Sequence, residues 1–155
     1  MREKVVFNSA PGGYTRLINH KEKKMEVKEL KKIIPWQELY CIEHSRELRN
    51  VLKEMAEDID HLPALYETDG DKNAECVLHY FDTYGAADWY VFEIDTETKQ
   101  AFGFVTLSGD IADPDAEFGY IDLGELCKSA RINLDLHFSG ITKDEIFKRK
   151  HGKTA

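Results

Sequence analysis

The chain has few cysteines and no long apolar run, and both shortages exclude classes of protein. Among its 155 residues are three scattered cysteines without a CxxC pair: Cys41, Cys76 and Cys127. An odd, dispersed set argues against a disulfide framework or a thiolate zinc site. Apolar runs are too short to span a bilayer, and the opening MREKVVFNSAPGG contains no apolar core of a secretory signal. We therefore expect a protein of the reducing cytoplasm.

Catalytic signatures are equally scarce. SAPGGYT lacks the lysine and spacing of a phosphate-binding loop, and neither GxGxxG nor GxSxG occurs. The six histidines show no HxH or HExxH spacing. The run DGDKNAE (69–75) spaces its acids like a calcium loop but lacks the glycine and the bidentate acid that such a loop requires. The sequence predicts no cofactor and no metal site, and it favours a protein that is not an enzyme.

Length and composition indicate one globular domain. Apolar residues make up 42% and charged residues 32% of the chain, which is too apolar for disorder. A chain of 155 residues can bury a sizeable core without cross-links. We expect one domain, 1–155, in which 1–60 form a hairpin and helices and 61–150 form a sheet.

Strand and helix patterns predict an α+β fold. A hairpin is expected around Pro11-Gly12-Gly13, a short helix ends at Pro35, and a long amphipathic helix, capped by Ser45, runs to Ile59. Capping boxes at Asp122/Glu125 and Thr142/Glu145 predict two later helices. Strands are expected at 76–81, 89–95, 100–107, 117–122 and 132–138. Their short connections predict an antiparallel meander of about five strands, with the long helix packed on one face and short helices at the edges.

The segment DWYVFEID raises the question of which side chains face the core. Strict alternation places Trp89, Val91, Glu93 and Asp95 on one face and Tyr90, Phe92 and Ile94 on the other. The second set is predicted to be core. In the next strand Gly103 is expected to leave room for the ring of Trp89 or Tyr90.

Charge is distributed unevenly along the chain. Residues 57–125 contain 18 acidic residues and only Lys72 and Lys99, a net charge of −16, whereas 1–56 and 126–155 each carry +4. Because phosphate is repelled by such a segment, nucleic-acid binding through the aromatic strands is not expected. An acidic surface can instead attract a basic partner and speed the encounter.

The acids that occur two residues apart suggest where such a surface would lie. In extended backbone, Asp113, Asp115 and Glu117 would present carboxylates about 7 Å apart, in imitation of a nucleic-acid backbone. The predicted binding surface comprises Trp89, Glu93, Asp95, Asp110, Asp113, Asp115, Glu117 and His137.

Two other interpretations remain open at this stage. His79 and His137 both fall in expected strands, so with Asp135 and the nearby Cys76 they could form a metal-dependent or acid–base site. A small-ligand pocket lined by Tyr84, Trp89 and Tyr120 is the other.

Four phrases in order resemble a known family. LPALYETDG (62–70), DWYVFEIDTETKQAFGFV (88–105), AEFGYIDLGEL (116–126) and LDLHF (134–138) are similar to domain-of-unknown-function family twenty-nine fifty-eight, over roughly 62–147. The resemblance implies a small protein of plasmids, conjugative elements or phages, and it carries over no catalytic residue. Its characteristic positions are matched by Trp89, Tyr90, Gly103, Gly119, Tyr120, Leu123, Glu125, Leu126, Asp135 and His137.

Charge and resemblance together lead to one expected function. The chain is predicted to be a non-enzymatic accessory protein of a mobile genetic element. It would bind a basic, nucleic-acid-handling protein through its acidic surface.

Overall fold

The computed structural model describes residues 25–152, and these residues form an α+β fold. Three helices come first, α2 (Val27–Lys31), α3 (Trp36–Glu43) and α4 (Arg46–Asp58). They are followed by β1 (Leu78–Asp82), β2 (Asp88–Asp95), β3 (Gln100–Thr106), β4 (Glu117–Asp122), α5 (Leu123–Leu126), β5 (Ile132–Leu134) and α6 (Lys143–His151). The hairpin expected around 11–13 lies outside the described residues.

The five strands form one antiparallel sheet in the order β4-β3-β2-β1-β5. The first four strands follow one another as a meander, as the short connections predict. β5 returns to pair with β1 on the other side, with Tyr80 opposite Leu134. β4 is therefore one edge of the sheet and β5 is the other.

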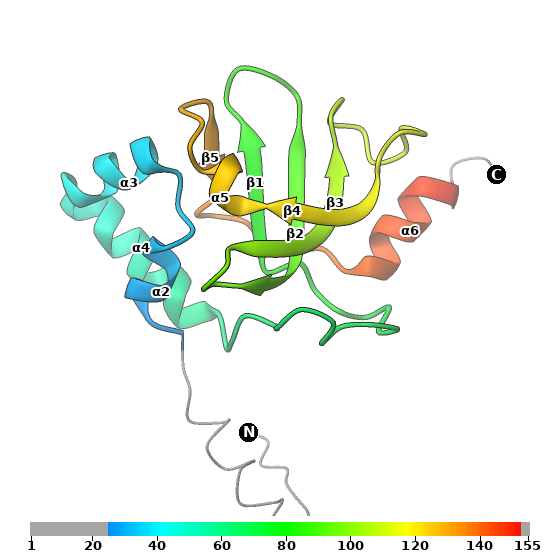
Figure 1. The fold of residues 1–155 in the computed structure, drawn as a ribbon, viewed down its shortest axis with the longest axis horizontal. Helices are drawn as coiled ribbons and strands as arrows, with labels where there is room; N and C mark the ends of the chain where they lie inside the picture. Colours follow the sequence, from blue (N-terminus) through cyan, green and yellow to red (C-terminus); the bar gives the residue numbers. More distant parts are fainter. Residues whose placement is uncertain (1–24, 153–155) are drawn as a thin grey trace, which may run out of the picture.

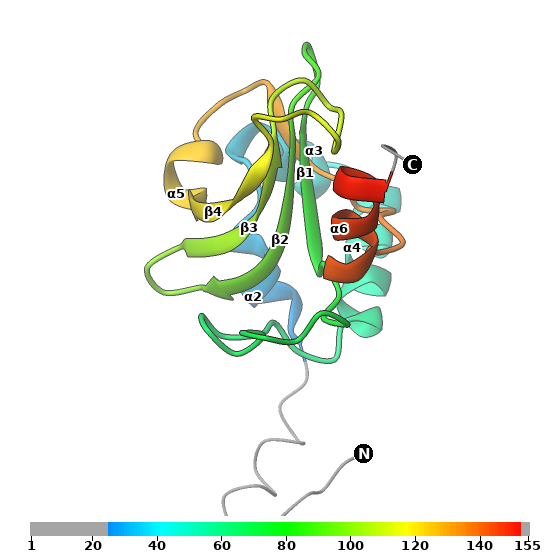
Figure 2. The ribbon, with the colours of Figure 1, turned by 90° about the vertical axis from the view of Figure 1, so that its right-hand side faces the viewer.

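Helices cover both faces of the sheet. α2, α3 and α4 lie on one side and α6 on the other, as two perpendicular views show (Figures 1 and 2). The larger core joins Leu30, Ile42 and Leu52 of the first three helices to Tyr80 and Val91 of the sheet. The smaller core joins Phe92 and Phe104 to Ile146 of α6.

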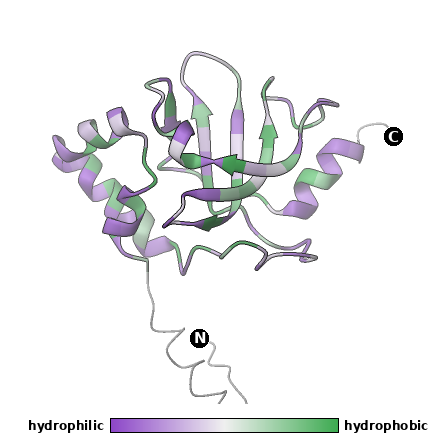
Figure 3. Cartoon of the chain, in the orientation of Figure 1, coloured by the Kyte–Doolittle hydropathy of each residue, from purple (hydrophilic) through white to green (hydrophobic). Residues whose placement is uncertain are grey.

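Hydropathy follows this layering. Hydrophobic residues concentrate on the strands, and hydrophilic ones cover much of α4 and α6 (Figure 3). No helix among residues 25–152 has the length and apolar character needed to cross a bilayer.

The helix caps confirm the signals read from the sequence. Ser45 Oγ accepts from the Leu48 amide at the start of α4, and Asp122 accepts from the Glu125 amide at the start of α5. Thr142 and Glu145 form the complete capping box of α6. The strands at 76–81 and 132–138 are shorter than expected, because pairing begins at Leu78 and ends at Leu134.

A β-bulge in β2 overturns the predicted alternation. Opposite β3, Val91 pairs with Gly103 but Glu93 pairs with Phe102, so the register shifts between Val91 and Glu93. One extra residue in a strand moves each later side chain of that strand to the opposite face of the sheet. Ile94 therefore joins Val91 in the larger core, and the prediction that it shares a face with Phe92 is wrong.

Glu93 is buried, and its placement at an acidic surface was wrong. Its side chain is 2% exposed and accepts hydrogen bonds from the Tyr66 amide (2.8 Å), the Thr68 amide (2.9 Å) and the Thr68 hydroxyl. Burial alone would raise the pKa of Glu93, but these hydrogen bonds and the charge of Lys143 outweigh it and lower the pKa. The carboxylate thus fixes the 66–68 loop against the sheet.

Gly103 is needed for backbone proximity at the bulge rather than for a ring. A Cβ at position 103 would overlap the carbonyl oxygen of Tyr90 and lie 2.9 Å from Val91 Cα. Its cross-strand partner Gly119 has open space where a Cβ would be. The two glycines of one pair are thus under different constraints.

We expect Gly103→Ala and Gly119→Ala to have different effects on the free energy of unfolding. Gly103→Ala should lower the free energy of unfolding by about 2 kcal/mol or more, because β2 and β3 must separate to admit the methyl group. Gly119→Ala should leave it unchanged or raise it by up to about 1 kcal/mol. Urea titration followed by circular dichroism measures both, and equal losses would contradict the close approach.

Glu93→Gln should cost about 2–3 kcal/mol, because an amide group replaces one acceptor of buried N–H and O–H donors. The matched control Glu97→Gln, which breaks only an exposed 3.2 Å pair with Lys32, should cost under about 1 kcal/mol. Since the folded-state pKa is lowered, the wild-type contribution is complete above the ordinary value of 4.5 and is lost as pH falls through the lower folded value. Urea titrations should show that the difference in free energy of unfolding between wild type and Glu93→Gln is smaller at pH 3 than at pH 7. An equal difference at both pH values would refute the role of the charge.

Candidate functional site

The acidic 110–117 loop is constrained by its own backbone. Asp110 accepts from the Ala112 amide and Asp113 from the Asp115 amide, both at 2.9 Å. The Ser108 hydroxyl, followed by the Asp115 amide, lowers the pKa of Asp113. These acids stabilise turns of the loop.

Cations of α6 share the surface of this loop. Lys150 Nζ donates to the Asp113 carbonyl oxygen at 2.7 Å. Lys148 and Arg149 line the same hollow as Asp110, together with the ring of Tyr90. Basic residues from the C-terminal end thus lie beside Asp110 and Asp113, whereas Asp115 and Glu117 are exposed.

Other residues of the predicted binding surface make contacts that stabilise the fold itself. Trp89 packs partly buried against the larger core. Asp95 accepts from the amides of Glu97 and Thr98 in the β2–β3 turn, and these bonds lower its pKa. The structure therefore does not gather Trp89, Asp95 and the 110–117 loop into one surface.

His79 is held between two carboxylates. Nε2 lies 2.8 Å from Asp88 Oδ1 and Nδ1 lies 3.2 Å from Asp135 Oδ2, and the ring stacks on Tyr90 at 4.8 Å. The side chain is only 13% exposed. Both ring nitrogens lie within hydrogen-bond distance of carboxylates from neighbouring segments. The arrangement serves to clamp β1, β2 and the chain after β5.

His137 does not join this cluster through its ring. It is exposed, and its backbone amide donates to Asp135 Oδ1 at 3.0 Å. Cys76 is buried, and burial raises the pKa of its thiol. Within residues 25–152 no group of three or more His, Cys, Asp or Glu side chains could hold a metal ion.

The predicted aromatic pocket is not formed. Trp89 packs with the core on the α2–α4 side. Tyr120, on the edge strand β4, instead contacts Phe102 of β3 and Tyr66. Tyr84 is 83% exposed on the β1–β2 loop, with the Arg131 guanidinium over its ring.

A different site lies between α4 and the segment 59–77. This groove of about 790 Å³ is closed on its third side by residues 136–140. Its floor is apolar, with Met55 of α4, the buried Cys76 and the half-buried Leu136. The 59–77 segment runs from the end of α4 along the bottom of the sheet (Figure 1).

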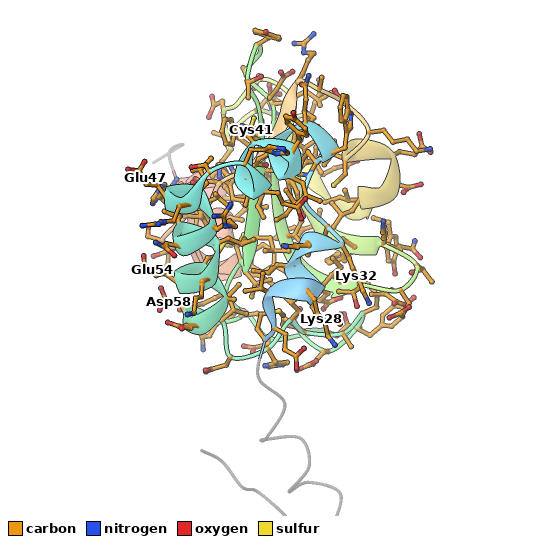
Figure 4. All side chains as sticks on the ribbon, turned by 90° about the vertical axis from the view of Figure 1, so that its left-hand side faces the viewer. Lys28, Lys32, Cys41, Glu47, Glu54 and Asp58 are labelled. Atoms are coloured by element: carbon orange, nitrogen blue, oxygen red, sulfur yellow. The ribbon has the colours of Figure 1, made fainter. Side chains whose placement is uncertain are left out.

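Carboxylates dominate the rim of this groove. Its charged lining residues, apart from His61 and His137, are all acidic: Glu54, Asp58, Asp60, Glu67, Asp71 and Glu75. Figure 4 shows Glu54 and Asp58 along one side of α4, and Lys28 of α2 and Lys32, which follows α2, on the other side. No lysine or arginine is among the lining residues that the structure describes. We call this site the acidic groove.

Hydrogen bonds hold the walls of the acidic groove in place. His61 Nε2 and Glu67 Oε2 are 2.8 Å apart, and Glu67 Oε1 accepts from the Ala64 amide. Thr68 is fixed by Glu93 from below. An isolated bridge between Glu75 and Thr142 joins the far wall to the start of α6. The rim is therefore largely preformed.

Among these lining residues, sequence reasoning singled out His137 for the binding surface and Cys76 for the alternative histidine site. The apolar stripe of the helix 45–59 is predicted to be core, and Leu52 is buried while Leu48, Met55 and Ile59 pack partly buried against the larger core. One edge of that stripe, Val51, Met55 and Ile59, also lines the groove together with the adjacent acids Glu54 and Asp58. That stripe, followed by the acids of 60–75, was the available signal.

Glu38 is a further residue that sequence reasoning missed. Its Oε1 accepts from the Leu134 amide at 2.7 Å, linking α3 to β5. Burial raises the pKa of Glu38 to about 7; the bond from Leu134 opposes the shift and the nearby Asp135 charge adds to it. The carboxyl group is therefore partly protonated at neutral pH.

No family model matches this chain, and neither a curated protein nor a solved structure is significantly similar to it. The site must therefore be interpreted from its own geometry.

Because the pKa of Glu38 rises from 4.5 to about 7 on folding, stability should fall as pH rises through that interval. Glu38→Gln should raise the free energy of unfolding by up to about 3 kcal/mol at pH 8 and change it little at pH 4. Urea titrations across this range measure the effect. The exposed Glu57→Gln is the control, and an identical effect of Glu38→Gln at both pH values would contradict the raised pKa.

Proposed function

We propose that this protein is a binding module that holds a basic segment of a partner protein in the acidic groove. The observation that supports this most directly is the lining itself, in which six carboxylates surround an apolar floor without a lysine or arginine. Groups of one charge sign above an apolar surface are complementary to a segment with basic and apolar faces.

The two parts of the groove have different roles in this proposal. The carboxylates attract a cationic segment over several ångströms, and salt weakens that attraction. The floor at Met55, Cys76 and Leu136 gives apolar contacts that salt does not screen. An amphipathic basic helix or turn fits both requirements better than a uniformly charged chain does.

The same charge disfavours direct binding of nucleic acid. The charged groups that phosphates would meet in the groove are six carboxylates and no lysine or arginine, with two histidines beside them. A nucleic-acid-handling protein remains a suitable partner, because its own basic segment would complement the groove. The mobile-element setting is part of this proposal and depends on the resemblance of residues 62–147.

Engagement of the acidic groove can be tested with the full chain and a labelled helical peptide. The peptide has about four turns, roughly 14 residues, with leucine on one face and lysine elsewhere. Glu54→Lys combined with Asp58→Lys should raise the Kd by about tenfold or more, because two attractions become repulsions. Fluorescence anisotropy at about 50 and 200 mM salt measures this, and wild-type binding should weaken at the higher salt.

Matched variants separate the groove from charge in general. Glu57→Lys combined with Glu125→Lys makes the same change of net charge at exposed residues outside the groove lining, and it should leave the Kd within about twofold. Asp113→Lys, Asp115→Lys and Glu117→Lys together should likewise have little effect. Equal weakening by all three sets, or equal affinity for a lysine–leucine peptide of scrambled order, would refute the assignment of the groove.

A further inference from the structure

β4 presents a free edge with an apolar centre. Among the described residues it pairs only with β3, so alternate N–H and C=O groups of β4 face away from the sheet. Edge strands are commonly protected by central charges, proline or a covering segment. In β4 the centre is Phe118-Gly119-Tyr120-Ile121, and the charged residues stand only at its ends, Glu117 and Asp122.

Four aromatic side chains adjoin this edge on the face opposite α4. Phe118 stacks on Phe102 at 6.0 Å, and Tyr120 meets Phe102 edge-on at 5.4 Å. The Tyr120 hydroxyl donates to the Tyr66 hydroxyl at 3.1 Å. Phe118 is 36% exposed, Tyr120 54% and Tyr66 64%, so these three residues are accessible to a partner. We call Tyr66, Phe102, Phe118 and Tyr120 the edge aromatic surface.

Tyr66 is held in this surface against its backbone preference. Its φ of 73° lies in the left-handed region, which is costly for a tyrosine. Its amide donates to the buried Glu93 carboxylate, which fixes that conformation. Strain of this kind persists only where the surroundings enforce it, and here it places an exposed ring beside an unpaired strand.

We propose that the edge of β4 binds an extended segment of a partner, which pairs with β4 as a sixth strand and lays its side chains on the edge aromatic surface. Alternate backbone groups supply the hydrogen bonds, and side chains on one face of the added strand contact the rings. Carboxylates of Asp69, Glu117 and Asp122 border the site, and aromatic faces attract cations. The segment therefore alternates apolar and basic residues.

A second copy of this chain fits the edge less well. Its net charge of −8 opposes self-association, and the carboxylates at both ends of β4 would approach their counterparts when two edges meet. The proposal does not depend on the acidic groove, because the two sites share no lining residue.

The test uses amide hydrogen exchange on the full chain with a synthetic peptide of roughly eight residues that alternates valine and lysine. With saturating peptide, the exchange of outward amides in β4 should slow by about tenfold or more, because they become hydrogen-bonded. The same peptide N-methylated at alternate residues keeps its side chains and cannot pair, so it should give no protection. Protection by both peptides, or by neither, would overturn the proposal.

Protein variants check the contribution of the rings. Tyr66→Gly suits the left-handed backbone and should fold normally, and Tyr120→Ala removes a half-exposed ring; each should raise the Kd by about tenfold. Tyr84→Ala, at another exposed tyrosine, should leave the Kd unchanged. Glu54→Lys combined with Asp58→Lys should leave β4 protection intact.

Three other results would overturn the proposal. Protection confined to α4 and 59–77 would assign the peptide to the acidic groove instead. Concentration-dependent protection of β4 without peptide, with a matching rise in sedimentation coefficient, would assign the edge to a second copy. Equal loss of affinity in the Tyr84 and Tyr120 variants would remove the role of the edge aromatic surface.

Discussion

The buried carboxylate of Glu93 is the interaction on which the exterior of this protein depends. Without the bulge in β2, residue 93 would face the α2–α4 layer with Val91; with it, Glu93 points to the opposite face and lies beneath the 66–68 loop. A buried carboxylate is tolerated only when its acceptors are satisfied. Here two amides and a hydroxyl supply the bonds, and Lys143 of α6 provides a positive charge while donating to the Thr68 carbonyl.

This one anchor positions parts of both proposed binding surfaces. Thr68 lies in the wall of the acidic groove, and Tyr66, two residues earlier, carries its ring to the edge aromatic surface. The loop between α4 and β1 therefore has a fixed course, although it contains neither helix nor strand. Two of the three bonds to Glu93 come from backbone amides, so the course of the loop depends on residue 93 more than on the loop's own side chains.

The charge of the chain is divided by the fold rather than spread over it. Basic residues from the ends meet acids of the middle at Asp82, which Arg131 contacts at 2.9 Å, at Glu97, which Lys32 contacts at 3.2 Å, and at the 110–117 loop beside α6. The lining of the acidic groove, by contrast, contains six carboxylates and no lysine or arginine among the described residues. Local neutralisation at some sites thus concentrates the net negative charge at another, which is a requirement for selective rather than diffuse attraction.

The sequence alone determined the elements that depend on local chemistry. The caps at Ser45, Asp122 and Thr142, the β4 bounds and the antiparallel meander all follow from nearby residues, because capping and short connections are local constraints. It also showed that residues 57–125 are strongly acidic. Which acids stay exposed was decided by the tertiary structure alone: one inserted residue buried Glu93, the return of α6 placed Lys150 beside Asp113, and α4 met the 59–77 segment to form a groove. Side-chain facing and charge pairing depend on contacts between distant segments, and periodicity along the chain does not encode them.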